Sequence, residues 1–402
     1  MLLFTAHRFL LLQHIFLMLI IILTNILPHP TRPNWQSQPV KPDILGYVSE
    51  DNQLILYDPQ SRTEKIVMDN VENFLLSSDG QIAYTSSLDG SEAGFYIIDP
   101  ANPEDKFVTI DQPMAYPLSW SPDGHYLAYL VFNADIDEND LYVWDGETVV
   151  NITPKNLLDS PSYYDLHWSQ DNRLAFGITH GWSGADAPSE LYVWNGHTTR
   201  NLRPNPENSD SLVEWSEDGK LIFLAWKDED TEFDVYIWNG KLFDESAFTP
   251  ILSEFRIVDA TWLDNHRIAF ISINKSESNV TKTVMIWDME KDEIVEWFPV
   301  KSELTYSRFS PDRRFVVSTH LASGIPSIYL EVEDSNGNIL LSTHVGELSW
   351  SRNGYLAYCG INERISELLT VWNGTETSLV KRLSYRPIQW QATERTFSCN
   401  NG

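Results

Sequence analysis

Hydrophobic and polar positions follow one short pattern that recurs through most of this chain. An aromatic residue precedes a Ser-x-Asp-Gly-type turn and a hydrophobic run, as in Trp120-Ser121-Pro122-Asp123-Gly124 before Leu127-Ala128-Tyr129. The aromatic position returns every 40 to 48 residues, at Leu76 in degenerate form, Trp168, Trp215, Trp262, Phe309, Trp350 and Trp390. A period of this length, with several short strands per unit, predicts an all-β fold of the β-propeller type.

A second hydrophobic run follows each turn at variable distance. The copy at 141–146 is rich in β-branched and aromatic residues and ends in Asp-Gly, which is typical of a strand closed by a tight turn. Each unit therefore predicts four strands. Eleven of the 15 tryptophans stand at repeat positions on the first and third strands, where we expect them to pack between neighbouring blades.

The repeats predict a single propeller of eight four-stranded blades. Seven complete units begin near Leu75, Leu118, Leu166, Val213, Ala260, Ser307 and Leu348. Residues 44–68 supply the second to fourth strands of a further unit, and residues 387–391 supply a first strand. We expect the two terminal segments to close one blade together, which removes free sheet edges. The tail at 395–399 resembles another second strand, so seven blades stay open as the alternative.

The quoted motifs resemble the WD40-like PD40 repeat of TolB-type propellers. The resemblance extends over about residues 44–391, most of the chain. It implies the propeller fold, but such blades occur both in periplasmic scaffolds and in the side domains of peptidases, so the function is left open. Peptidases with this kind of propeller carry a separate hydrolase domain, for which the repeats leave no residues in the given sequence.

The charge of the chain excludes some partners. The formal net charge is -29 at pH 7. This argues against a nucleic-acid partner, because phosphate binding requires basic patches. It also argues against docking of the propeller onto an anionic lipid surface.

The N-terminal segment predicts export. Residues 9–27 are almost wholly apolar and long enough for one transmembrane helix, and Arg8 precedes them. No small-residue cleavage site follows, so an uncleaved anchor is favoured over a cleaved signal. We expect an anchor or signal at 1–27, a proline-rich linker at 28–43 and a propeller at 44–402. The propeller would lie at the cell surface or in a periplasm-like space, or be secreted after cleavage.

Two cysteines, Cys359 and Cys399, each follow a motif tryptophan by nine residues. At equivalent positions of neighbouring blades, their Cα atoms would lie beyond the ~7 Å limit of a disulfide. Export permits oxidation, and a displaced C-terminal strand would shorten the distance. Free thiols are favoured, and a disulfide stays open.

Long second-to-third-strand loops are the expected place of function, since the other links on the opposite face are tight turns. Asp135, Asp137 and Asp140 alternate in one such loop, and carboxylates are ligands that Ca²⁺ prefers. The full calcium-loop pattern is missing. Ca²⁺ is therefore a weak prediction, and a solvated acidic loop is favoured.

The same kind of loop carries six candidate ligand- or partner-binding residues outside the packing motif: His180, Trp182, Asp186, Trp226, Asp228 and His320. Residues 179–186 combine an imidazole, an indole, a hydroxyl and a carboxylate, which suits stacking and hydrogen bonding to a sugar or a peptide. The spacing of the histidines and Asp186 matches no recognised metal site. Trp182 is the sharpest candidate, because exposed aromatic residues often anchor interfaces.

The sequence contains no recognised catalytic signature, such as a nucleophile elbow, a His-Glu-x-x-His motif or a phosphate-binding loop. We therefore predict a membrane-tethered, non-enzymatic scaffold that binds a protein or peptide on the long-loop face. One alternative is a propeller hydrolase, glycosidase-like, acting through carboxylates about 5–9 Å apart at the pore mouth. Another is a structural domain of an envelope assembly.

Overall fold

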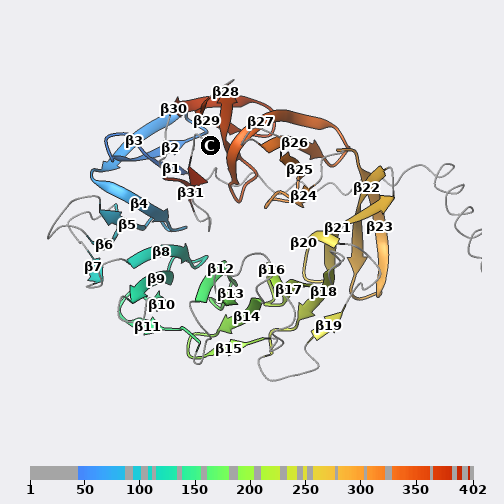
Figure 1. Ribbon diagram of the computed structural model, residues 1–402, viewed down its shortest axis with the longest axis horizontal. Helices are drawn as coiled ribbons and strands as arrows, with labels where there is room; N and C mark the ends of the chain where they lie inside the picture. The colour runs from blue at the N-terminus through green and yellow to red at the C-terminus, as the bar shows by residue number, and fades with distance from the viewer. Residues whose placement is uncertain are drawn as a thin grey trace, which may run out of the picture. The chain divides into compact units, whose positions relative to one another are not determined.

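Antiparallel β-strands make up every regular element of the described residues (Figure 1). The computed structural model describes residues 44–86, 94–100, 107–110, 115–133, 138–154, 161–180, 189–202, 210–226, 233–241, 248–250, 257–276, 279–302, 306–321, 328–362, 365–382, 387–391 and 397–398. The all-β prediction is therefore confirmed. These ranges contain no helix that could span a membrane, and the helix predicted at 9–27 lies outside them.

Five sheets hold four strands each, paired in chain order. The first two are β4 (Val71–Leu76), β5 (Ile82–Ser86), β6 (Phe95–Ile98), β7 (Phe107–Ile110), and β8 (Ala115–Trp120), β9 (Leu127–Asn133), β10 (Glu138–Trp144), β11 (Val149–Asn151). The next two are β12 (Pro161–Trp168), β13 (Leu174–His180), β14 (Ser189–Trp194), β15 (Thr199–Asn201), and β16 (Asp210–Trp215), β17 (Leu221–Trp226), β18 (Phe233–Trp238), β19 (Phe248–Pro250). The fifth is β20 (Ile257–Trp262), β21 (Arg267–Ser276), β22 (Asn279–Asp288), β23 (Glu293–Val300).

A sixth sheet holds seven strands because one strand is shared between two sets of pairings. It comprises β24 (Tyr306–Phe309), β25 (Phe315–Leu321), β26 (Ile328–Asp334), β27 (Ile339–Trp350), β28 (Leu356–Asn362), β29 (Ile365–Trp372) and β30 (Thr377–Arg382). The first half of β27 pairs with β26 and its second half with β28. This strand therefore continues from the outer edge of one four-strand set to the inner edge of the next.

The last sheet joins the two ends of the described chain. Its strands are β3 (Thr63–Met68), β2 (Leu54–Asp58), β1 (Leu45–Val48), β31 (Pro387–Trp390) and β32 (Phe397–Ser398). Leu45 pairs with Trp390 and Tyr47 with Ile388, so the predicted pairing of the C-terminal first strand with the N-terminal strands is confirmed. β32 adds to the opposite edge of β31. The tail is thus an extra strand and does not duplicate β1.

Contacts between first strands link the sheets into a ring (Figure 1). β4 contacts β8, and the contacts continue through β12, β16 and β20 to β24; β27 contacts β31, which contacts β4. The topology of four-stranded antiparallel sheets arranged in this way is that of a β-propeller.

The Ser-x-Asp-Gly motif folds into a tight turn because its side chains satisfy the turn backbone. Ser121 Oγ donates to Asp123 Oδ1 at 2.6 Å and accepts from the Tyr126 amide at 2.9 Å. Gly124 has a φ of 76°, which favours glycine. The same Ser–Asp bond recurs at Ser216 and Asp218. The repeated polar positions are therefore local requirements of the turn.

Tryptophans fill the space between neighbouring sheets, as predicted. All eleven repeat tryptophans are buried: Trp120, Trp144, Trp168, Trp194, Trp215, Trp238, Trp262, Trp287, Trp350, Trp372 and Trp390. Several form edge-to-face pairs, such as Trp168 with Trp194 at 6.1 Å, a geometry that adds about 0.5–1.5 kcal/mol to area burial. Trp215 Nε1 also donates to the His167 carbonyl of the preceding sheet at 2.8 Å.

The cysteine prediction requires correction. Cys359 is buried on β28 and is disulfide-bonded, and the sequence holds one other cysteine, Cys399, directly after β32. The expectation of free thiols assumed that both cysteines occupy equivalent second strands. The strand that precedes Cys399, β32, pairs with the edge of β31 opposite β1 and is therefore not a second strand of the repeat.

Candidate functional site

Most of the predicted binding and metal residues lie outside the described side chains. Trp182, Asp186, Asp228, Asp135 and Asp137 fall in undescribed segments. The predictions made for them, including Ca²⁺ binding, therefore stay predictions. Among the described residues no group of three or more His, Cys, Asp or Glu side chains is placed to hold a metal ion.

The remaining candidates lie at equivalent ends of second strands, apart from Asp140. His180 ends β13, Trp226 ends β17, and His320 is the next-to-last residue of β25, where it is exposed. Asp140 lies in the third strand β10, opposite Val131. The repeat therefore brings these backbone positions to corresponding places in three sheets, next to the long loops.

A polar cluster that sequence reasoning missed lies on the first strands of three consecutive sheets. Glu214 on β16 accepts from the Trp262 amide of β20 at 2.9 Å and from Thr261 Oγ1 at 2.6 Å. Arg313, in the turn between β24 and β25, adds an ion pair to Glu214 at 3.1 Å. Asp259 on β20 repeats the arrangement one sheet further, accepting from the Phe309 amide at 2.7 Å. Side chains of one sheet thus satisfy amides on the inner strand of the next.

The acidity of Asp259 is strongly perturbed. Desolvation by the surrounding protein raises its pKa to about 7, although the Phe309 amide and the charge of Arg308 act in the opposite direction. The negative charge of Glu214 raises the pKa further. A carboxyl group that exchanges its proton near neutral pH has the chemistry of a general acid or base. The only sequence signal for it was a carboxylate on a strand predicted to pack between blades.

A lysine and two serines form a second cluster between β22, β24 and β25. Lys282 Nζ donates to Ser307 Oγ at 2.7 Å, and Ser307 Oγ lies 2.7 Å from Ser318 Oγ. Burial lowers the pKa of Lys282 to about 8, against the opposing charges of Glu333 and Glu331. A serine beside a lysine of lowered pKa can act as a nucleophile. All three residues are at least 95% buried, however, so this cluster joins the sheets and does not meet a substrate.

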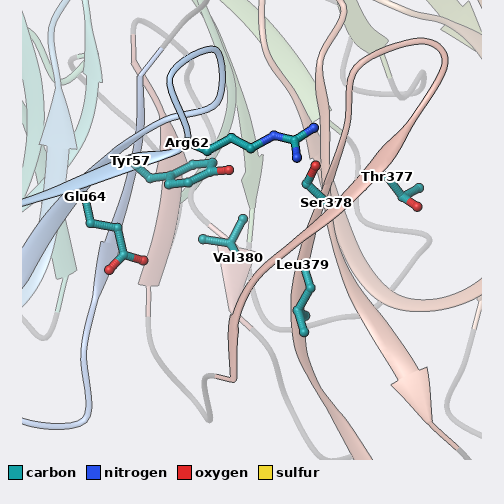
Figure 2. Close-up of a pocket in the computed structure, with 7 residues that line it drawn as sticks. All are labelled: Tyr57, Arg62, Glu64, Thr377, Ser378, Leu379 and Val380. Atoms are coloured by element: carbon teal, nitrogen blue, oxygen red, sulfur yellow. The ribbon is translucent and has the colours of Figure 1, made fainter.

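A surface pocket of about 430 Å³ lies between the β2–β3 hairpin and β30 (Figure 2). Tyr57, Arg62 and Glu64 form one side, and Thr377 to Val380 form the other. Figure 2 shows the Arg62 guanidinium directed toward Ser378. Arg62 also pairs with Glu376 at 3.6 Å, but both side chains are largely exposed, so the pair contributes little. The lining of this pocket contains no convergent set of catalytic side chains.

Comparison with solved structures shows similarity to peptidases. Porphyromonas gingivalis dipeptidyl peptidase 4 matches with a TM-score of 0.54 and 13% identity, over 87% of this chain and 60% of that one. Prolyl oligopeptidase B from Galerina marginata matches with a TM-score of 0.51 and 15% identity, over 80% and 51%. A prolyl endopeptidase from a study of inter-domain dynamics in catalysis and specificity matches with a TM-score of 0.50 and 14% identity, over 83% and 54%.

These similarities establish the fold and leave the family open. The chain spans only about half to three-fifths of the length of the three peptidases. No protein-family model matches the chain, and no curated protein matches it in sequence.

The similarities also contradict the prediction of a non-enzymatic scaffold and the prediction that the chain is not an enzyme. The three structures named above are peptidases. The prediction relied on the absence of a catalytic signature, and the repeat residues that dominate the sequence serve packing and turn formation.

Proposed function

We propose that this chain is the propeller of a peptide-hydrolysing enzyme and that it controls which peptides reach the reaction centre. The observation that carries the proposal is the similarity, over 80–87% of this chain, to three peptidases. One of them is described in terms of inter-domain dynamics in catalysis and specificity. This proposal takes up the hydrolase alternative, with a peptide bond in place of a glycosidic bond.

The proposal includes the finer points of architecture and location. We propose eight blades, with β27 serving as the outer strand of one blade and the inner strand of the next. We also propose PD40-type repeats and an exported propeller tethered by residues 9–27. The disulfide at Cys359 supports export, because disulfides persist in oxidising compartments.

The test is hydrolysis and binding of peptides by the natively expressed, full-length protein. Fluorogenic peptides with and without proline, and with free or blocked N-termini, should be cleaved or bound saturably. Aryl glycosides serve as the control substrates. Cleavage of glycosides alone would instead support the carboxylate pair Glu214 and Asp259 as the reacting groups. If the protein neither binds nor hydrolyses any peptide, the proposal is wrong.

Two variants refine the test. If the long-loop face admits the peptide, Trp182→Ala should raise KM for the best peptide at least threefold while the melting temperature stays nearly unchanged. Trp194 is buried in the packing motif, and Trp194→Ala should instead lower the free energy of unfolding by about 3–5 kcal/mol. A Trp182→Ala protein that unfolds like Trp194→Ala would remove Trp182 from the substrate path.

A further inference from the structure

The side chain of Arg173 joins two neighbouring sheets, β12–β15 and β16–β19, across the space between them, which we call a seam. Arg173, at the end of the turn between β12 and β13, donates to the carbonyls of Gly219 at 3.0 Å and Gly240 at 3.3 Å. Its guanidinium lies 4.8 Å from the Trp215 ring centre and 5.7 Å from that of Trp238. Asp171 forms an ion pair with Arg173 at 3.0 Å, and the Arg173 side chain is only 15% exposed. This seam therefore forms a binding site for a guanidinium group, and the chain's own Arg173 occupies it.

The same turn position holds a cation in two other sheets. Lys220 donates to the Asn265 carbonyl of the next sheet at 3.2 Å and pairs with Asp218. Arg314 donates to the Asn353 carbonyl at 3.0 Å and pairs with an aspartate of its own turn, Asp312. The cation in each of these turns is therefore bound by an aspartate and by backbone carbonyls. Lys220 also lies over a tryptophan ring, at 6.0 Å.

The seam between β4–β7 and β8–β11 keeps these ligands but has a shorter side chain in the cation position. Ile82 pairs with Ile98 as Leu174 pairs with Trp194, which places Gln81 where Arg173 stands. Leu127 pairs with Trp144 as Leu221 pairs with Trp238, which places Trp144 where Trp238 stands. Gln81 reaches the Gly124 carbonyl at 3.3 Å.

A cavity of about 360 Å³ remains in this seam. Its lining includes Asp79, Gln81, Asp99, His125, Trp144 and Gly146. Trp144 and Gly146 correspond to Trp238 and Gly240 of the seam that Arg173 occupies, which we call the filled seam. Asp79 corresponds to Asp171. The volume is in the range of ligand pockets.

The lining of the cavity includes the acidic side chain of Asp79. Asp79 accepts from Ser77 Oγ and from Gln81 Nε2, the latter at 2.9 Å, and it forms no ion pair among the described residues. Asp99 adds a second carboxylate to the lining. The cavity therefore offers the carboxylates of Asp79 and Asp99, the indole of Trp144 and, at Gly146, the position that corresponds to Gly240. Such groups favour a planar cation that donates several hydrogen bonds.

We propose that this seam cavity binds the guanidinium group of an arginine side chain presented by a peptide or protein. The bound guanidinium would take the position that Arg173 has in the filled seam, with Asp79 as its counter-ion and the Trp144 ring packed against it. The proposal is independent of peptide hydrolysis and holds or fails by binding alone.

The test uses Nα-acetyl-arginine N-methylamide as the probe, with the full chain at pH 8 and low salt, followed by calorimetry and by the indole ¹H–¹⁵N signals. The matched citrulline derivative has the same shape without the charge, and the lysine derivative carries the charge on an ammonium group. The arginine probe should bind saturably, at least tenfold more tightly than citrulline and more tightly than lysine. Equal binding of arginine and citrulline would overturn the proposal.

Substitutions locate the site. Gln81→Arg should fill the cavity, weaken the probe at least tenfold and raise the melting temperature. Gln170→Arg adds the same side chain at an exposed turn position and should leave binding unchanged. Asp79→Asn should also weaken the probe at least threefold, which keeps the test decisive if Gln81→Arg fails to fold. Arg173→Gln should open a second cavity and add a second binding equivalent. Unchanged binding in both Gln81→Arg and Asp79→Asn would sink the proposal.

Discussion

Glu214 accepts a hydrogen bond from the backbone amide of Trp262, which lies 48 residues later on the first strand of the next sheet. The inner edge of a sheet otherwise leaves its amides without a partner in that sheet, and an unpaired buried donor is costly. Gln389 meets the same need by accepting from the Leu76 amide at 2.8 Å, and Asp259 by accepting from Phe309. The inner strands are therefore joined by side chains as well as by packing.

The first prediction concerns this bond. Glu214→Ala removes the acceptor of the Trp262 amide and of Thr261 Oγ1, so the free energy of unfolding should fall by about 1–3 kcal/mol. Glu214→Gln keeps an acceptor and should lose less. Urea unfolding measures both, and Glu217→Ala at an exposed position of the adjacent turn is the control. Equal losses in Glu214→Ala and Glu217→Ala would show that the bond contributes nothing.

The second prediction is a pH dependence from Asp259. Because burial raises its folded-state pKa from 3.8 to about 7, the folded protein binds more protons than the unfolded chain between these values. The stability of the wild type relative to Asp259→Asn should therefore fall as pH rises from about 4 to 7, by at most about 1.4 kcal/mol per pH unit. Denaturant unfolding at several pH values checks this. If the free energy of unfolding of the wild type, relative to that of Asp259→Asn, stays constant or rises with pH, the assigned pKa is wrong.

Much of the fold could be predicted from the sequence because the turn motif is local. The first and second strands flank a Ser-x-Asp-Gly turn whose hydrogen bonds lie within six residues, as at Ser121 and Tyr126. The burial of repeat tryptophans such as Trp390 followed from their spacing. Two features did not follow, namely the continuity of β27 and the pairing of β32 with the edge of β31 opposite β1. Both depend on how distant strands close the ring, which no local pattern encodes.

The candidate sites were harder to predict because they arise between sheets. Glu214 and Asp259 stand on strands that the repeat assigns to packing, and their acceptor role requires amides about 50 residues away. The seam cavity depends on Gln81 being shorter than the arginine at the equivalent position of another repeat, Arg173. Aligning the repeats would reveal that difference. Its consequence, an open space beside Trp144, requires the three-dimensional arrangement.

The third prediction concerns the disulfide of Cys359. The sequence holds one other cysteine, Cys399. A bond to it would close a loop of 40 residues, restrict the unfolded chain and stabilise the protein by about 4 kcal/mol in the chain-entropy model. Cys399→Ser should therefore lower the melting temperature. Unfolding of the wild type with and without a reductant, compared with Cys399→Ser with and without it, is the measurement. A wild type indifferent to the reductant would show that the bond has no role in stability.

The last prediction separates two reasons for glycine in the tight turns. Gly80 and Gly124 both have positive φ values, 99° and 76°, so alanine is strained at either position, by about 1–2 kcal/mol. A Cβ at Gly80 would meet nothing within 4 Å, whereas one at Gly124 would lie 2.5 Å from Asp79 Oδ1 of the preceding sheet.

Gly124→Ala must therefore also displace the carboxylate that lines the seam cavity. It should cost more stability than Gly80→Ala, and it should weaken the arginine probe while Gly80→Ala does not. Chemical unfolding and the probe titration are read on the same two proteins. Equal stability losses with unchanged binding would mean that Asp79 moves freely and is not held in place as a counter-ion.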